Sequence, residues 1–189
     1  MKKRSWILGA LLVMGLVRQA GAVEEAVYSL VSRDGRFEVR DYAAMILAET
    51  LVEGDRASAG NRGFDPLFNY ISGENRTRHE IPMTAPVFQS PTGQQWAVAF
   101  VMPADAKREG WPEPENPSVR LQEIPARRMA VVRYSGFWSD KRYVEHESML
   151  RAWMAAQGLE PAGDAVWARY NPPFTPWFLR RNEVMIPVR

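Results

Sequence analysis

The side chains best suited to acid–base chemistry or metal binding are two histidines, because this 189-residue chain contains no cysteine. His79 lies in the polar stretch 72–80, where charged neighbours favour a solvent-exposed loop over a metal ligand. His146 lies on the apolar stripe of a predicted helix over residues 139–157. A histidine there either borders the hydrophobic core or reaches a buried metal ion, so His146 is the candidate metal ligand.

No motif of a known catalytic site accompanies these histidines. A Gly-x-Ser-x-Gly elbow, a His-Glu-x-x-His helix and a glycine-rich phosphate loop are absent, and the carboxylates follow no spacing that singles out a pair. We therefore predict no catalytic residue and no enzyme. The lack of cysteine excludes disulfides, thiolate zinc sites, iron–sulfur clusters and covalent c-type haem, so any cofactor must be held non-covalently.

Residues 1–22 are predicted to be a signal peptide that is cleaved before Val23. Three basic residues are followed by the apolar run 6–17 and by the small residues Ala20-Gly21-Ala22. As a helix the apolar run would be about 18 Å long, whereas a bilayer core needs roughly 30 Å. We expect export to the periplasm and no stable membrane insertion after cleavage, the alternative being an uncleaved anchor.

The charge of the chain changes with this cleavage. Removal of the signal peptide takes four of the 24 Lys and Arg residues and none of the 22 Asp and Glu residues, so the net charge falls from +2 to −2. The remaining chain has no long basic run. We therefore predict no binding of nucleic acid, which depends on neutralising phosphates with many cations.

Two halves of the chain share one predicted order of elements: strand, strand, helix, strand, strand. The first half has strands over 37–42 and 45–52, a helix over 55–72, and strands over 81–89 and 96–103. The second half has strands over 119–124 and 129–134, a helix over 139–157, and strands over 166–170 and 184–188. The pattern repeats after about 82 residues, which predicts two β-α-β-type repeats over about 37–103 and 119–188.

The two halves are predicted to form one domain, residues 23–189. Residues 104–118 between them contain three prolines among charged residues and indicate a linker or surface loop. A domain boundary is not expected there, because neither half alone would bury both faces of its sheet.

The residues of the two predicted helices favour helix formation to different degrees. Ser139 can cap the second helix, whose apolar stripe includes Tyr143 and Leu150. The first helix contains Gly60, Gly63 and Pro66, all of which disfavour a helix. Its apolar side chains form either a deformable pocket wall or a packed core with a proline kink.

The segment Ile81–Val87, IPMTAPV, cannot lie in a helix interior or a central strand, because Pro82 and Pro86 each lack an N–H group and keep the preceding residue extended. This string resembles the most characteristic motif of the SOUL haem-binding protein family. Three further stretches fit the resemblance in the same order, namely 37–42 (FEVRDY), 170–173 (YNPP) and 181–184 (RNEV). The similarity covers roughly residues 27–188, and with the signal peptide it indicates a bacterial, exported member.

The resemblance implies an α+β fold in which the two repeats close into a distorted antiparallel β-barrel flanked by two α-helices. It also implies a haem pocket between the first helix and the loop after the YNPP motif, with Arg62 either pairing with a propionate or remaining a surface charge. The candidate cofactor-binding residues are Arg62, Phe64, Leu67, Phe68, Ile71, Phe174 and Trp177. Asp41 occupies the position of the histidine proposed as iron ligand in one family member, which argues against histidine ligation here.

The implied function is non-covalent, reversible binding of haem or a related tetrapyrrole for storage, transport or sensing. A first alternative is the binding of other small amphipathic molecules, because the fold resembles the effector-binding domains of multidrug-responsive regulators. A second alternative is a haem-dependent or hydrolytic enzyme, although neither a proximal histidine nor a distal acid–base group can be placed.

Overall fold

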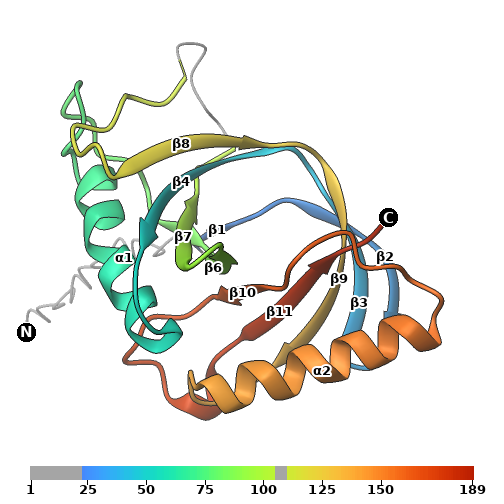
Figure 1. Ribbon diagram of the computed structural model, residues 1–189. Helices are drawn as coiled ribbons and strands as arrows, with labels where there is room; N and C mark the ends of the chain where they lie inside the picture. The colour runs from blue at the N-terminus through green and yellow to red at the C-terminus, as the bar shows by residue number, and fades with distance from the viewer. Residues whose placement is uncertain (1–22, 105–109) are drawn as a thin grey trace, which may run out of the picture.

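The computed structural model describes residues 23–104 and 110–189 (Figure 1). The predicted signal peptide, residues 1–22, lies outside the described residues. Within the described ranges, two α-helices, α1 (Arg56–Ile71) and α2 (Asp140–Ala156), accompany a large sheet, and one 3-10 turn, η1 (Trp177–Leu179), lies near the C-terminus. Two short strands, β1 (Glu24–Glu25) and β5 (Thr84–Ala85), pair in parallel beside the sheet.

The large sheet has nine strands, and every pair of neighbours is antiparallel. The strands are β2 (Tyr28–Asp34), β3 (Phe37–Tyr42), β4 (Met45–Val52), β6 (Val87–Thr92), β7 (Gln95–Val101), β8 (Val119–Ile124), β9 (Arg127–Tyr134), β10 (Val166–Arg169) and β11 (Asn182–Pro187). Their spatial order is β2-β3-β9-β11-β10-β6-β7-β4-β8, and the sheet curls strongly into a half-barrel (Figure 1). The α+β fold with a curled antiparallel sheet and two helices is confirmed.

The order of the strands reflects the two halves of the chain. The first strand of each half pairs with the second strand of the other half, as β3 does with β9 and β8 with β4, while β6 and β10 meet at the centre. Strands of one half therefore form hydrogen bonds with strands of the other half. A half without its partner would leave these strand edges unpaired.

Three predicted details differ from the structure. Strand β2 was not predicted, because as an edge strand it is exposed along most of its length and lacks the alternation of apolar and polar residues. The single strand expected over 81–89 is divided at Pro86, which lacks the N–H group that a continuous ladder needs. Strand β11 begins two residues earlier than expected, because the polar residues Asn182 and Glu183 are buried and pair with both β9 and β10.

Helix α2 confirms its predicted cap and stripe. The Ser139 hydroxyl oxygen accepts a hydrogen bond from the Arg142 amide at 3.4 Å, and the helix buries Tyr143, His146, Leu150 and Met154. These side chains pack against β9 and β11. Helix α2 lies along the sheet in Figure 1. Helix α1 packs instead on β4 and β7, so each helix covers a different part of the sheet.

Candidate functional site

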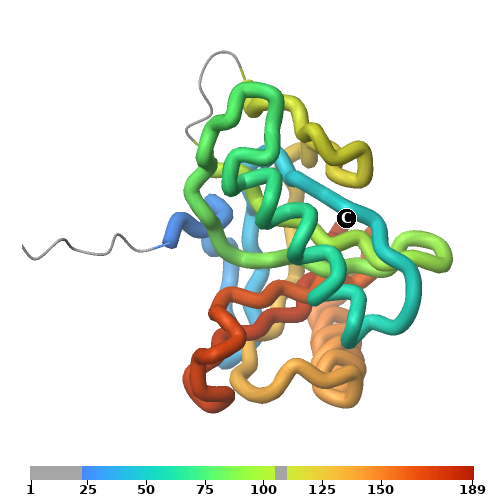
Figure 2. The backbone as a smooth tube through the Cα atoms, turned by 90° about the vertical axis from the view of Figure 1, so that its left-hand side faces the viewer, coloured from blue at the N-terminus to red at the C-terminus, as the bar shows by residue number. Residues whose placement is uncertain are grey.

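A cleft of about 510 Å³ lies between α1, the IPMTAPV segment and the residues that follow β10. In Figure 2, α1 and the segment after β10 lie on the same side of the molecule. The volume falls in the range of small-molecule sites. The lining is mostly apolar and consists of Val23, Gly60, Asn61, Phe64, Asp65, Phe68, Met83, Thr84, Ala85, Val87, Trp138, Arg169, Tyr170, Asn171, Pro172, Pro173 and Phe174. The fold thus joins two motifs that are almost ninety residues apart in the chain.

Helix α1 can form this wall because its glycines allow close packing. A Cβ atom on Gly63 would lie 2.6 Å from the Cβ of Val98, and one on Gly60 would lie 2.0 Å from Nη2 of Arg169. Asp55 caps the helix by accepting a hydrogen bond from the Ser58 amide at 2.9 Å. The glycines that weaken the helix as an isolated segment therefore let it approach the sheet and Arg169.

Arg169 provides the positive charge in the cleft. Its Nη2 donates to the Gln89 side-chain oxygen at 3.2 Å, and its guanidinium carbon lies 5.1 Å from the centre of the Trp138 ring. No carboxylate lies within ion-pair distance of Arg169 among the described residues. Asp65 also lines the cleft, but from the exposed surface of α1. The cleft therefore offers a half-buried cation whose charge is not neutralised by an ion pair among the described residues.

Three of the seven predicted cofactor-binding residues line the cleft, and the other four lie outside its lining. Phe64, Phe68 and Phe174 line the cleft. Leu67 and Ile71 point into the hydrophobic core and are not among the lining residues. Trp177 stacks on Phe137 at 5.4 Å between ring centres, outside the lining.

Arg62 also lies outside the lining of the cleft. Its guanidinium turns back toward the start of α1, donating to the Glu53 carbonyl and to the Ser58 hydroxyl at 3.0 Å. Arg169 was missed by the sequence analysis. Its position directly before the YNPP motif was the available signal, because that motif leads into the cleft.

Neither histidine lines the cleft. His146 lies on α2, and its ring stacks on Tyr134 at 3.7 Å. Its Nδ1 lies 2.7 Å from the Arg142 carbonyl, which can only accept, so Nδ1 carries the proton of the neutral ring. Burial lowers the pKa of His146. His79 is exposed in the 72–80 loop, as predicted.

Other routes to metal binding are equally limited in the described part of the chain. It contains no group of three or more His, Cys, Asp or Glu residues placed to hold a metal ion. Asp41 forms two hydrogen bonds with Arg128, at 2.7 and 2.8 Å, which lower the pKa of its carboxyl group. The position of the family histidine is therefore engaged in a surface ion pair, away from the cleft.

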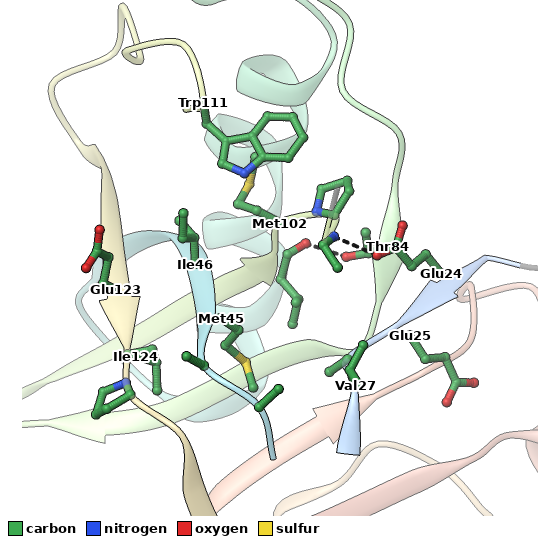
Figure 3. Close-up of a pocket in the computed structure, with 17 residues that line it drawn as sticks. Glu24, Glu25, Val27, Met45, Ile46, Thr84, Met102, Trp111, Glu123 and Ile124 are labelled. Atoms are coloured by element: carbon green, nitrogen blue, oxygen red, sulfur yellow. Dashed lines mark hydrogen bonds between the residues drawn. The ribbon is translucent and has the colours of Figure 1, made fainter. Parts of the chain in front are cut away.

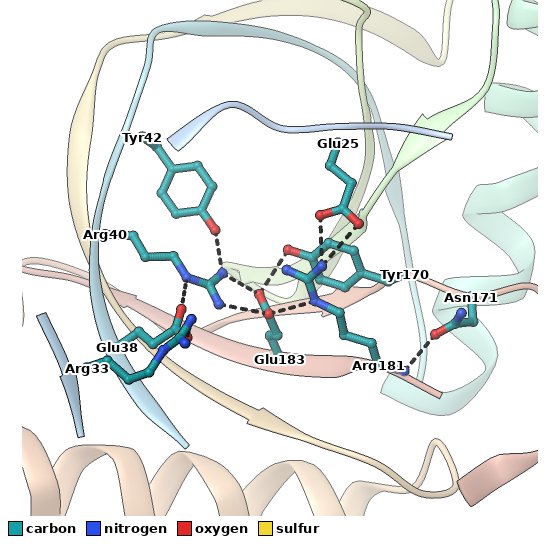
Figure 4. Close-up of polar contacts among 9 residues, drawn as sticks. All are labelled: Glu25, Arg33, Glu38, Arg40, Tyr42, Tyr170, Asn171, Arg181 and Glu183. Atoms are coloured by element: carbon teal, nitrogen blue, oxygen red, sulfur yellow. Dashed lines mark hydrogen bonds and ion pairs between the residues drawn. The ribbon is translucent and has the colours of Figure 1, made fainter. Parts of the chain in front are cut away.

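A buried ion network lies behind the cleft, inside the curl of the sheet (Figure 4). Arg40 and Glu183 are 1% and 0% exposed and form two hydrogen bonds, at 2.8 and 3.0 Å. Arg181 Nε donates to Glu183 at 2.9 Å and Arg181 Nη1 to Glu25 at 2.8 Å. Burial acts to raise the pKa of Glu183, but the two arginines and Tyr170 outweigh it and hold that pKa below its ordinary value.

This network anchors one wall of the cleft. The Tyr170 hydroxyl donates to Glu183 at 2.9 Å, and the Asn171 side-chain oxygen accepts from the Arg181 amide at 2.6 Å (Figure 4). Burial raises the pKa of Tyr170 well above its ordinary value, so the phenol keeps its proton. The first two residues of the YNPP motif are thus held by the buried Glu183 carboxylate and by the Arg181 backbone, and Tyr170 does not supply a phenolate to the cleft.

A second cavity, of about 680 Å³, lies at the ends of β4, β7 and β8 and beside β1 (Figure 3). Met45, Ile46 and Trp111 form apolar walls, but Glu24, Glu25 and Glu123 bring carboxylates to its lining. No Lys or Arg belongs to that lining among the described residues. An anionic ligand is therefore disfavoured in the larger cavity and favoured in the cleft.

Comparison with known proteins agrees with the motifs. The profile of the family described as "SOUL heme-binding protein" matches residues 23–187. The chain belongs to the SOUL family. Within 187 aligned residues it is 25% identical to "Heme-binding protein 1" of Xenopus laevis, over 91% of this chain and 97% of that protein. The mouse (Mus musculus) "Heme-binding protein 1" is 24% identical over 92% of this chain and 98% of its own length.

Solved structures share the fold of this SOUL protein at low sequence identity. The EcmrR C-terminal domain has a TM-score of 0.63 and 13% identity, covering 86% of this chain and 98% of the domain. A structure described as a hydrolase from Listeria innocua has a TM-score of 0.57 and 13% identity, covering 84% and 94% of the two chains. In the described residues of the SOUL chain, no helix is both long and apolar enough to cross a membrane.

Proposed function

We propose that this SOUL protein binds haem or a related tetrapyrrole reversibly and non-covalently in the cleft beside α1. The observation that carries the proposal is Arg169, a cation without an ion-pair partner among the described residues, set in an otherwise largely apolar lining. A tetrapyrrole presents the complementary chemistry, with flat apolar faces and anionic propionates. Storage, transport and sensing would all use this binding step.

Different side chains of the cleft would bind the faces and the propionates of the tetrapyrrole. Phe64, Phe68 and Phe174 offer aromatic surface to the faces of the macrocycle, and Arg169 would pair with a propionate. Bound haem would supply an iron centre. Methionine can ligate haem iron through its neutral sulfur, and Met83 lines the cleft. Exchange of the ligand is expected, because neither a cysteine nor a lining histidine holds it.

Hemin titration of residues 23–189, followed by absorption spectroscopy, tests this function. Substitution Arg169→Gln should weaken binding by about one to two powers of ten, because a charge-assisted hydrogen bond contributes roughly 1.5–3 kcal/mol. Arg120→Gln is a matched control on β8, outside the lining of the cleft. Equal affinity of all three proteins would exclude the cleft as the site, and no binding by the parent would exclude the function.

Binding of other small amphipathic molecules is the second candidate, and the carboxylate-lined cavity favours it for cations. A lipophilic cationic dye such as rhodamine 6G would meet apolar walls and the exposed Glu123 there. Fluorescence titration of the dye against the parent and Glu123→Gln distinguishes the two functions. Tight dye binding that Glu123→Gln weakens, together with undetectable hemin binding, would favour this alternative.

The protein is further proposed to act in the periplasm after cleavage before Val23. The support is the order of basic, apolar and small residues in 1–22. N-terminal sequencing of the protein from a native cell envelope tests both statements. A chain that retains Met1 in the membrane fraction would contradict them.

A further inference from the structure

Large apolar side chains are exposed together at the end of the molecule that carries η1. Phe137, Trp177, Phe178 and Leu179, which we call the apolar tip, are between 47% and 64% exposed. They form a cluster, because Phe137 stacks on Trp177 at 5.4 Å and Phe178 lies edge-on to Trp177 at 5.6 Å. A contiguous apolar patch of this kind on a soluble domain indicates an interaction surface.

The loop that carries η1, and with it three of the four tip residues, is ordered by its own contacts. Arg180 donates to the carbonyl oxygens of Thr175 and Pro173 at 2.8 and 2.6 Å, and its guanidinium lies 4.4 Å from the centre of the Trp138 ring. The backbone between these residues is thereby closed into a compact turn. The exposure of the aromatic rings is therefore a property of the folded loop.

A shallow basic hollow of about 620 Å³ adjoins the tip. Arg36, Arg133 and Arg142, which we call the basic rim, line it and have no carboxylate within ion-pair distance among the described residues. The acidic residue of the hollow, Glu38, is already paired with Arg33 and Arg40. Three positive charges of the hollow thus remain available.

The hollow and the tip are joined by a short stretch of chain. The Arg142 guanidinium lies 3.3 Å from where a Cβ atom on Gly136 would be, and Phe137 is the next residue. Ser135, one residue earlier, lines the hollow. Figure 2 shows the loop before α2 and the loop that carries η1 at the same end of the molecule. Apolar rings and free guanidinium groups therefore share one surface.

We propose that this surface docks onto an anionic phospholipid bilayer. Aromatic and leucine side chains bind in the interfacial region of a membrane, and arginines pair with lipid phosphates. A second copy of the chain fits less well, because a symmetric contact would bring the arginines of the basic rim together. The net charge of residues 23–189 is −2, so attraction to an anionic surface must come from this local group.

The docking surface lies next to the cleft in which haem is proposed to bind. A role of docking in haem exchange rests on that proposed function. Phe174 lines the cleft and belongs to the loop that carries the tip, and it is 85% exposed. A docked molecule would hold the mouth of the cleft near the lipid, where an apolar tetrapyrrole dissolves. Membrane docking itself does not require haem, so the two proposals can fail separately.

Co-sedimentation with lipid vesicles tests the docking. Residues 23–189 are the appropriate chain, because they contain every described element, whereas the apolar run 6–17 could bind lipid by itself. Vesicles of phosphatidylcholine alone are compared with vesicles of equal parts phosphatidylcholine and phosphatidylglycerol. Binding should be stronger to the anionic vesicles and should weaken as salt is added.

Two sets of substitutions locate the surface. The triple variant Arg36→Gln, Arg133→Gln, Arg142→Gln should bind anionic vesicles about a hundredfold more weakly, since each basic residue near such a surface contributes about a factor of five. The double variant Trp177→Ser, Phe178→Ser should bind about tenfold more weakly. The control with the same charge change is Arg76→Gln, Arg78→Gln, Arg120→Gln, and it should bind like the parent.

Several results would overturn the docking proposal. They are absence of vesicle binding by the folded parent, unchanged binding of either variant, and an equal loss in the control. Sedimentation velocity without lipid tests for self-association, and a dimer that the Trp177→Ser, Phe178→Ser variant abolishes would show a second copy as the partner. Hemin titration of the same variant separates the proposals, because its affinity should equal that of the parent.

Discussion

The cleft beside α1 and the cavity at the ends of β4, β7 and β8 are neighbours that differ in charge. Thr84 lines both, yet the cleft contains Arg169, whereas the larger cavity contains Glu24 and Glu123 besides Glu25, which is paired with Arg181. Volume alone would favour the larger cavity for a flat macrocycle. Charge favours the cleft, because a buried propionate needs a cation and is repelled by carboxylates. The comparison predicts that charge decides which of the two hollows suits an anionic ligand.

The ion network connects the two hollows, since Tyr170 lines the cleft and Glu25 lines the cavity. Removing its central carboxylate should therefore weaken the walls of both hollows. Glu183→Gln should destabilise the fold by about 3 kcal/mol, because Arg40 and Arg181 would lose the carboxylate that they share, while Arg40 keeps its ion pair with Glu38. Urea unfolding measures the effect, with Glu123→Gln as the control. A stability change within about 0.5 kcal/mol would show that the network does not support the fold.

Acid should act on the same group. The pKa of Glu183 is lowered in the folded state, so its contribution to stability is fully present above the unfolded value of 4.5 and is lost as pH falls through the folded value. Unfolding measured at several pH values should show this loss in the parent and a flatter acid limb in Glu183→Gln. Parallel acid limbs would assign the pH dependence to other carboxyl groups.

Reversing the charge of the cleft should make it resemble the other cavity. Arg169→Glu places a carboxylate against the aromatic walls, so hemin affinity should fall by about a hundredfold or more. Hemin titration gives the affinity, and thermal melting shows whether the fold is intact. Retained affinity in a folded variant would mean that the propionates lie elsewhere.

The approach of α1 to Arg169 can be altered without changing any charge. Gly60→Val would place a side chain where Nη2 of Arg169 now lies, and the guanidinium, as the end of a flexible side chain, should move rather than unfold the helix. We expect hemin affinity to fall by about tenfold. Gly93→Val in the β6–β7 turn is the control, because no atom lies within 4 Å of the added Cβ. The φ of Gly93, 61°, disfavours valine, so the hemin affinities of the two variants are compared at a temperature at which both are folded.

The smallest effect is expected at Arg62, which the sequence favoured. Arg62→Ala should change hemin affinity by less than about threefold, because its guanidinium is bound to Glu53 and Ser58 and does not line the cleft. Titration beside Arg169→Gln decides between the two arginines. A loss of ten- to a hundredfold at Arg62 would support the interpretation made from the family resemblance.

Local structure was predictable because it depends on neighbouring residues. The span of α2 and its Ser139 cap agree with the structure, as does the span of α1 despite its glycines. Strand β2 was not found, since an exposed edge strand carries no periodic apolar pattern. The IPMTAPV and YNPP motifs indicated the region of the cleft, and three of the seven proposed binding residues line it.

By itself the sequence determined the class of fold, the family and the absence of any cysteine-based attachment. Only the tertiary structure decided which arginine enters the cleft and which charges are buried. Arg40 and Glu183 are 143 residues apart and meet because β9 lies between β3 and β11. Helix periodicity and capping act over a few residues, whereas such pairings depend on strand order, which no local pattern encodes.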